Sequence, residues 1–241
     1  MIPLRDLNPT RRTPFLTYTL IVVNVVVFLW EQSFSSDQQL VAVLQQISVV
    51  PVLAAPAPFA AATLGDVLRS MFLHGGWAHL LGNMLYLYLF GDNVEDRFGH
   101  LLFLLLYLGS GYIAAMAQVA MDPTSEIPLI GASGAIAGVL GSYLVFFPAV
   151  RVRGIIPLGF FGWFAEWPAW IVLLLWFGLQ LFNGFALLGM PSGQGGVAFF
   201  AHIGGFVFGA LMTLLLMAML PQPPAENRYQ MLYDRANRYR F

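Results

Sequence analysis

Residues 131–141 read Gly-Ala-Ser-Gly-Ala-Ile-Ala-Gly-Val-Leu-Gly, an apolar run of small residues with one hydroxyl near its start. This run predicts a helix that begins close to Ser133. The amide N–H groups of a first helical turn have no carbonyl partner within the helix. Free N–H donors beside an open hydroxyl are what an acyl-transfer nucleophile and its oxyanion hole require. Small residues spaced at i, i+4 also allow membrane helices to pack closely, which is the commoner reason for such a pattern. The run by itself therefore leaves both interpretations open.

The composition is that of a membrane protein. Hydrophobic residues make up 59% of the 241 residues and charged residues only 10%, and the mean hydropathy is +0.73. Soluble domains carry roughly 25% charged residues. The formal net charge of −1 gives no support for a nucleic-acid partner. The chain has no cysteine, which excludes disulfides, a thiol nucleophile and thiolate-bound metals.

Apolar runs of about 17–25 residues predict membrane-spanning helices, and six such runs occur. The expected fold is therefore an all-α membrane protein, a bundle of six transmembrane helices. The first run is too long for a signal peptide and is not followed by a small-residue cleavage site. The expected spans cover residues 14–30, 72–90, 101–121, 131–147, 167–188 and 197–220. We expect a membrane domain over 14–220, a polar N-terminal segment over 1–13 and a polar tail over 221–241.

Arginine placement predicts the orientation of these spans. All 11 positive charges are arginines, and six spans place every one except Arg69 on the same side of the membrane. The positive-inside rule then puts both termini in the cytoplasm. The long connection after the first span is expected to form a structured outer loop with interfacial helices, one of them over 64–71. A second outer loop, 189–196, is rich in glycine.

Four polar side chains fall at one predicted depth. Ser133 opens the fourth span, His202 lies near the start of the sixth, and His79 and Asn83 share one face of the second at i, i+4. At a rise of about 1.5 Å per residue, each lies on the order of 10 Å below the outer surface. Polar groups within spans are costly and are candidates for function by default.

Glycines make the helix faces near these side chains thin. Gly131 and Gly134 flank the serine, while Gly205 and Gly209 follow His202 at i+3 and i+7. Small residues also occupy the positions four and eight residues after the serine. Thin faces permit close approach of two helices. We therefore expect these glycines to be structural residues that bring the histidine ring to the hydroxyl.

This placement predicts a Ser–His dyad. Serine is a weak nucleophile until an adjacent base accepts its proton, and His202 is the expected base for Ser133. No acidic residue is predicted at this depth, so we expect no carboxylate partner. His79, Asn83 and the backbone N–H of Ser133 would stabilise the oxyanion, at about 3–4 kcal/mol per donor.

Each of these residues has another interpretation when taken alone. A single histidine in a span more often joins two helices by a hydrogen bond than acts as a base, and His79 and Asn83 could do the same. Coincidence of all four at one depth favours a catalytic site. A zinc protease is disfavoured because His-Glu-x-x-His is absent from the sequence. An intramembrane aspartyl protease is disfavoured because no predicted span carries a central aspartate.

The chain resembles the rhomboid family of intramembrane serine proteases in its six-span bacterial form. Glu95-Asp96-Arg97 is similar to the family's Glu-x-Arg, which is usually structural. The resemblance covers about residues 14–220. Its three signatures, in order, are His79-Leu80-Leu81-Gly82-Asn83-Met84, Gly131-Ala132-Ser133-Gly134 and Ala201-His202-Ile203-Gly204-Gly205.

The resemblance implies that Ser133 is the nucleophile, His202 the general base, and His79 with Asn83 oxyanion donors. It implies cleavage of single-span membrane proteins near the outer face of a bacterial inner membrane, in a multi-pass protein that uses water and needs no cofactor or metal. Loop 189–196 would be a cap over the site. Some family members carry an aromatic residue four positions after the serine that stacks on the histidine, whereas this chain has Ala137.

Two other functions compete with proteolysis. The first is a catalytically inactive rhomboid-like scaffold that binds membrane proteins, as in the pseudoproteases and Derlin relatives. Those proteins lack the serine or the histidine, and this chain has both. The second is a small-solute transporter, but transporters often contain inverted repeats and the sequence shows no such symmetry.

Overall fold

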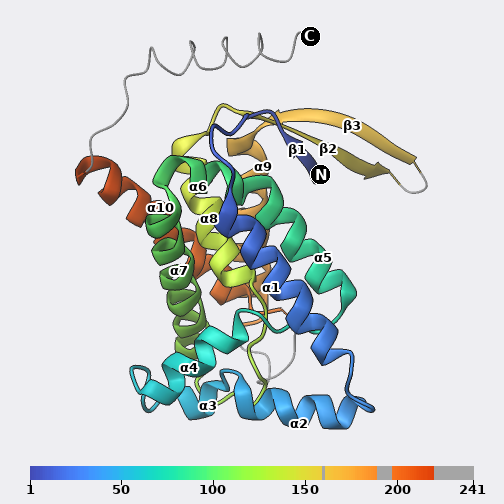
Figure 1. Ribbon diagram of the computed structural model, residues 1–241, viewed down its shortest axis with the longest axis vertical. Helices are drawn as coiled ribbons and strands as arrows, with labels where there is room; N and C mark the ends of the chain where they lie inside the picture. The colour runs from blue at the N-terminus through green and yellow to red at the C-terminus, as the bar shows by residue number, and fades with distance from the viewer. Residues whose placement is uncertain (159–160, 189–196, 220–241) are drawn as a thin grey trace.

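Helices form an elongated bundle with a small β-sheet at one end (Figure 1). The computed structural model describes residues 1–158, 161–188 and 197–219. Helices α1, α5, α7, α8 and α10 run lengthwise, and α2, α3 and α4 gather at the end away from the sheet (Figure 1). The elements are β1 Ile2–Asp6, α1 Phe15–Glu31, α2 Asp37–Ile47, α3 Pro51–Ala54, α4 Ala61–Ser70, α5 Trp77–Tyr86, η1 Leu87–Gly91, α6 Asp92–Phe98, α7 His100–Met121, α8 Ser133–Phe146, β2 Arg151–Leu158, β3 Phe161–Pro168, α9 Ala169–Ala186 and α10 Phe199–Met219.

Each predicted span coincides with a helix. Within the described ranges, α7, α9 and α10 are long and apolar enough to cross a membrane, while α1 and α8 are apolar but shorter. Helix α5 continues through the π-helical turn η1 into α6. These apolar helices support an integral membrane protein, and the number of crossings stays a prediction. A helix, α4, also lies where the outer loop was expected to contain one. The predicted cap at 189–196 and the tail at 221–241 lie outside the described residues.

The expectation of an all-α protein is wrong at the sheet end. Strands β1, β2 and β3 form an antiparallel sheet in that order, although residues 151–168 were expected to be a connector and the start of a span. Val152 lies opposite Trp167, and Ile156 lies opposite Trp163. β-branched and aromatic side chains favour strands and stabilise them as cross-strand pairs. Their alternation with arginine and glycine was overlooked beside the stronger apolar runs.

A partly buried carboxylate joins the sheet to the bundle. Asp6 Oδ2 accepts hydrogen bonds from Asn93 Nδ2 at 2.8 Å and from the Tyr143 hydroxyl at 2.9 Å. Burial raises the pKa of Asp6 from its ordinary value of 3.8 to about 6, although the Tyr143 hydrogen bond acts in the opposite direction. Burial, assisted by the charge of Asp6, raises the pKa of Asp92 to about 7. Both carboxyl groups therefore hold protons more tightly than they would in water.

The Glu95-Asp96 pair fixes the start of α1, which agrees with the structural role expected for this motif. The Glu95 carboxylate accepts from the backbone N–H groups of Leu16 at 2.8 Å and Thr17 at 2.7 Å. Asp96 accepts from the N–H of Arg12 at 3.0 Å, just before the helix. Negative charge is favourable at a helix N-terminus because the unpaired N–H groups and the helix dipole point toward it.

Helices α8 and α10 approach closely because their facing positions are glycines. A Cβ built at Gly205 would overlap the carbonyl oxygen of Gly134, and one at Gly209 would overlap that of Gly138. The buried Ser142 hydroxyl reaches the carbonyls of Gly138 at 2.9 Å and Gly209 at 3.2 Å. Such close backbone approach is typical of small-residue interfaces in membranes. It brings the first turns of α8 and α10 together.

Candidate active site

Ser133 is the first residue of α8, at the end of that helix farther from the sheet (Figure 1). The preceding loop is held in place by the N–H of Gly131, which donates to the carbonyl of Ser70 at 2.9 Å. Gly131 has a φ of +123°, a conformation that residues with a Cβ rarely adopt. A Cβ there would also lie 2.7 Å from His79 Nε2. Glycine at this position therefore allows the loop to pass close to His79 just before the serine at the head of the helix.

The structure brings His202 to Ser133 although 69 positions separate them in the sequence. His202 Nε2 lies 2.7 Å from Ser133 Oγ, and His202 Nδ1 lies 2.8 Å from Oε1 of Gln180 on α9. The three side chains thus form a chain of hydrogen bonds from α8 through α10 to α9. Gln180 itself is buried.

Gln180 determines which nitrogen of His202 carries the proton. A carboxamide oxygen accepts hydrogen bonds and cannot donate them, so Nδ1 must hold the proton. Nε2 is then the acceptor for the Ser133 hydroxyl. The assignment of the carboxamide is consistent with its surroundings, because its Nε2 donates to the carbonyl of Trp176 at 3.4 Å. This is the arrangement that a general base needs.

Trp176 lies beside the ring of His202. It supplies the aromatic neighbour that Ala137, four positions after the serine, cannot provide. The ring centroids of Trp176 and His202 are 5.8 Å apart. The orientation of His202 thus depends on α9, which supplies both the indole and the Gln180 carboxamide. Neither residue is among those expected from the sequence, because this span reads as apolar throughout. The available signal was Gln180 itself, a polar side chain in the middle of a long apolar run.

His79 and Asn83 both lie on α5, and His79 reaches the serine loop. His79 borders Gly131 through its imidazole, as the built Cβ position shows, and its ring also contacts His74 with centroids 5.1 Å apart. Asn83 is buried, and its Nδ2 has no hydrogen-bond partner among the described residues. A buried N–H₂ group without an acceptor is unfavourable in a resting structure. An oxyanion role for Asn83 stays a prediction.

A buried glutamate, also missed from the sequence, fixes the loop before α5. Both Glu31 carboxylate oxygens lie within 3.1–3.2 Å of the backbone N of His74. Glu31 is only 1% exposed. This contact ties the end of α1 to the segment that positions His79.

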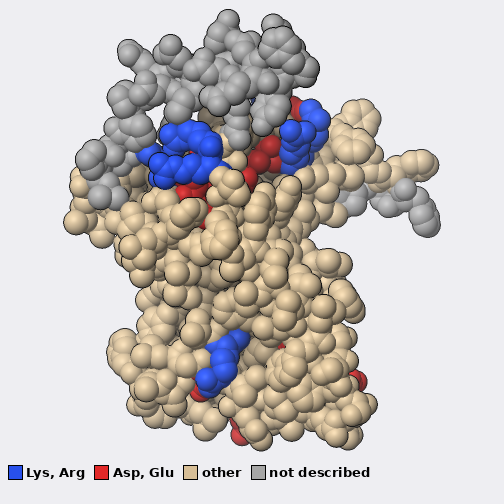
Figure 2. Space-filling view, in the orientation of Figure 1, with Lys and Arg blue, Asp and Glu red and all other residues tan. Residues whose placement is uncertain are grey.

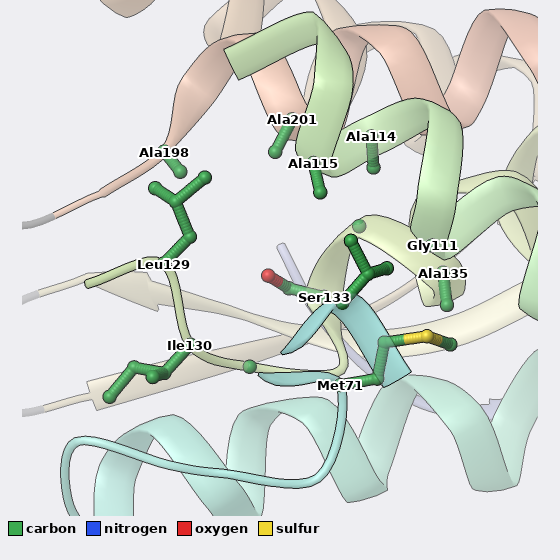
Figure 3. Close-up of a pocket in the computed structure, with 13 residues that line it drawn as sticks. Met71, Gly111, Ala114, Ala115, Leu129, Ile130, Ser133, Ala135, Ala198 and Ala201 are labelled. Atoms are coloured by element: carbon green, nitrogen blue, oxygen red, sulfur yellow. The ribbon is translucent and has the colours of Figure 1, made fainter. Parts of the chain in front are cut away.

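A small apolar cavity lies beside Ser133, as Figure 3 shows. Its volume is about 50 Å³, and Ser133 supplies the hydroxyl at its edge. The lining comes from α4, α7, α8, α10 and the loop that leads to the serine. Its residues are mostly small and apolar, among them Gly111, Ala114, Ala115, Ala198 and Ala201, together with Met71. A cavity of this size and polarity suits a small side chain.

Nothing in the described ranges resembles a metal centre, since no group of three or more His, Cys, Asp or Glu residues is placed to hold an ion. The fold and the site together define a helical membrane protein with a partly buried Ser–His pair at a helix start.

Comparison with known sequences identifies the family. The family model for the Rhomboid domain matches residues 62–219, which is more than half of the chain. The chain therefore belongs to the rhomboid family.

Named relatives come from bacteria and plants. Rhomboid protease AarA of Providencia stuartii is 27% identical over 83% of this chain and 71% of its own length. RHOMBOID-like protein 4 of Arabidopsis thaliana is 34% identical over 63% of this chain and 34% of its own length. Rhomboid protease GluP of Bacillus subtilis is 42% identical over 32% of this chain and 15% of its own length. The chain thus spans about a third or less of the last two relatives.

Proposed function

We propose that this protein is an intramembrane serine protease that cleaves transmembrane segments of membrane proteins near the outer face of the membrane. The observation that carries the proposal is the 2.7 Å contact between His202 Nε2 and Ser133 Oγ. The other ring nitrogen, Nδ1, is hydrogen-bonded to Gln180 Oε1. Membership of a family whose relatives include named proteases supports the same class of reaction.

The reaction follows from these positions. Ser133 Oγ attacks the scissile carbonyl while His202 Nε2 accepts its proton, and the proton then passes to the leaving amine. The oxyanion is stabilised by the N–H of Ser133, by Asn83 Nδ2 and by His79. Water then hydrolyses the acyl-enzyme with His202 again acting as base. The residues themselves suffice for this chemistry without a cofactor.

The cavity beside Ser133 indicates which substrates fit. Its Ala and Gly lining favours a small residue at the cleavage point. A transmembrane helix keeps its carbonyls in internal hydrogen bonds, so the substrate segment must unwind before attack. Single-span proteins with glycine or proline near the cleavage point are the preferred substrates, since those residues weaken a helix.

The charge distribution supports the expected orientation. Figure 2 shows arginines gathered at the sheet end of the molecule and a smaller group toward the opposite end, where Arg69 pairs with Asp66. The positive-inside rule places the sheet and the N-terminus in the cytoplasm. The site then lies toward the outer face of a six-span, multi-pass protein of a bacterial inner membrane. The membrane domain covers 14–220, with 1–13 and 221–241 as cytoplasmic segments.

A serine-directed fluorophosphonate probe tests the proposal directly. The native protein should be labelled, whereas Ser133→Ala should not react and His202→Ala should react much more slowly. Cleavage of a model single-span substrate in vesicles should follow the same order. Labelling that persists in Ser133→Ala would remove this serine from its role. An unlabelled, inactive native protein that still binds the substrate would support the alternative, an inactive rhomboid-like scaffold.

A further inference from the structure

The β2–β3 hairpin extends sideways from the end of the bundle (Figure 1), and its outer part exposes large aromatic side chains. Phe161 is 82% exposed and Trp163 is 68% exposed. Most of their surface is left uncovered by the described residues. Aromatic side chains of this size bury a large apolar area when they find a partner.

Register shows that the two faces of the hairpin differ. In an antiparallel pair, directly opposed residues share a face and successive residues alternate between faces. Val152 opposite Trp167 and Ile156 opposite Trp163 lie on one face, which also carries Phe161. We call this the aromatic face.

The other face, which we call the charged face, carries its charges near the root of the hairpin and has Phe164 opposite Ile155 farther out. Arg153 lies opposite Glu166, and Arg5 of β1 lies opposite Arg153. Arg153 Nε donates to Glu166 Oε1 at 2.7 Å. Arg5, Arg151 and Arg153 are all exposed. These groups favour water.

The aromatic face is the one that meets the bundle at the root of the hairpin. Val152, at the root of the hairpin, is fully buried and belongs to the core of the bundle. Trp167 on the same face packs partly against that core. Farther out the described strands pass beyond the helices (Figure 1), so the outer part of this face lies beside the bundle rather than against it.

We propose that the aromatic face of the β2–β3 hairpin rests on the lipid surface at the sheet end of the bundle, with Phe161 and Trp163 inserted among the headgroups and upper acyl chains. Tryptophan is enriched at this depth of a membrane because its ring is amphipathic. Arginines on the outward face remain in water, within reach of anionic headgroups by long-range attraction. The hairpin thus acts as a lateral anchor for a protein that is already integral to the membrane.

The chain has no cysteine, so single-cysteine variants of the full protein can be spin-labelled at one position each. We compare Phe161→Cys and Trp163→Cys with Phe164→Cys, a matched control. Phe164 is 67% exposed on the same strand, but it lies opposite Ile155 on the charged face. The labelled proteins are reconstituted in vesicles of phosphatidylcholine and phosphatidylglycerol. Collision with oxygen, which concentrates in lipid, is measured against collision with a water-soluble nickel chelate.

We expect the spin labels at positions 161 and 163 to collide more with oxygen than with the nickel chelate. The label at position 164 should collide more with the nickel chelate than with oxygen. Strong nickel access at all three positions would show the hairpin in water and overturn the proposal. Low access to both reagents at 161 and 163 would show that protein covers the face, either a second copy or another segment of this chain, and would also overturn it.

A second measurement uses the native side chain. Brominated lipids quench tryptophan fluorescence on contact, and the native protein should lose more signal than the Trp163→Phe variant. Equal quenching in the two proteins would contradict insertion of Trp163.

Discussion

Replacing Gln180 by leucine removes the acceptor of the His202 Nδ1 proton while nearly conserving side-chain volume. In the resting protein this hydrogen bond measures 2.8 Å. In the proposed reaction it gains importance, because the imidazole takes the serine proton and becomes positively charged. A hydrogen bond to a charged group contributes about 1.5–3 kcal/mol. At about 1.4 kcal/mol per tenfold in rate, we expect kcat to fall roughly 10- to 150-fold.

The assay is cleavage of a single-span substrate by purified protein in vesicles, with kcat and KM determined separately. KM should change little because Gln180 contacts the base rather than the substrate. Gln180→Glu should retain much of the activity, since a carboxylate accepts the same hydrogen bond. Asn183→Leu provides the matched control, because it makes the same kind of change one turn away on α9 and should leave kcat within about twofold of native.

Two results would refute this reasoning. One is an unchanged kcat in Gln180→Leu, under conditions in which Ser133→Ala is inactive. The other is an equal loss in Gln180→Leu and Asn183→Leu, which would indicate a general disturbance of α9. Thermal unfolding of both variants separates these cases from simple loss of folded protein.

Three further predictions concern packing, pH and specificity. Gly209→Ala should lower the free energy of unfolding by about 1–3 kcal/mol, because the added Cβ would overlap a carbonyl of α8. Gly178→Ala is the control and should be nearly neutral, because its Cβ would meet open space. Equal unfolding temperatures of the two variants in detergent would contradict this prediction. The pKa of Asp6 is raised to about 6 in the folded protein. Between about pH 4 and 6 the folded state therefore binds more protons than the unfolded state. The free energy of unfolding should fall as pH rises through that window. Asp6→Asn should flatten this dependence in thermal melts at about pH 5 and 7, and an unchanged slope would count against it. Ala115→Leu should fill the cavity beside the serine. It should lower kcat/KM at least tenfold for a substrate with alanine at the cleavage point, and less for a substrate with glycine there. An equal loss for both substrates would show that the cavity does not bind this side chain.

Much of the protein could be predicted from local sequence patterns. Long apolar runs indicate membrane helices because the bilayer requires about 20 apolar residues per span, and every expected span contains a helix. Ser133 and His202 were also found this way, since a polar residue within such a run is conspicuous. The hydrogen bond between them then followed from glycine spacing on both helices.

Other features depend on contacts between distant segments, and no local stretch of sequence predicts them. Gln180 gains its role only because α9 packs against α10, where it meets His202 from 22 positions away. The third strand of the sheet, β1, pairs with β2 across some 150 residues, and no periodicity within the first few residues predicts that partner. The sequence by itself thus determined the membrane class and singled out Ser133 and His202, which the structure places 2.7 Å apart, because hydropathy and residue type act locally. Only the tertiary structure decided which helix orients the histidine and where the hairpin lies, because those depend on the packing of separate elements.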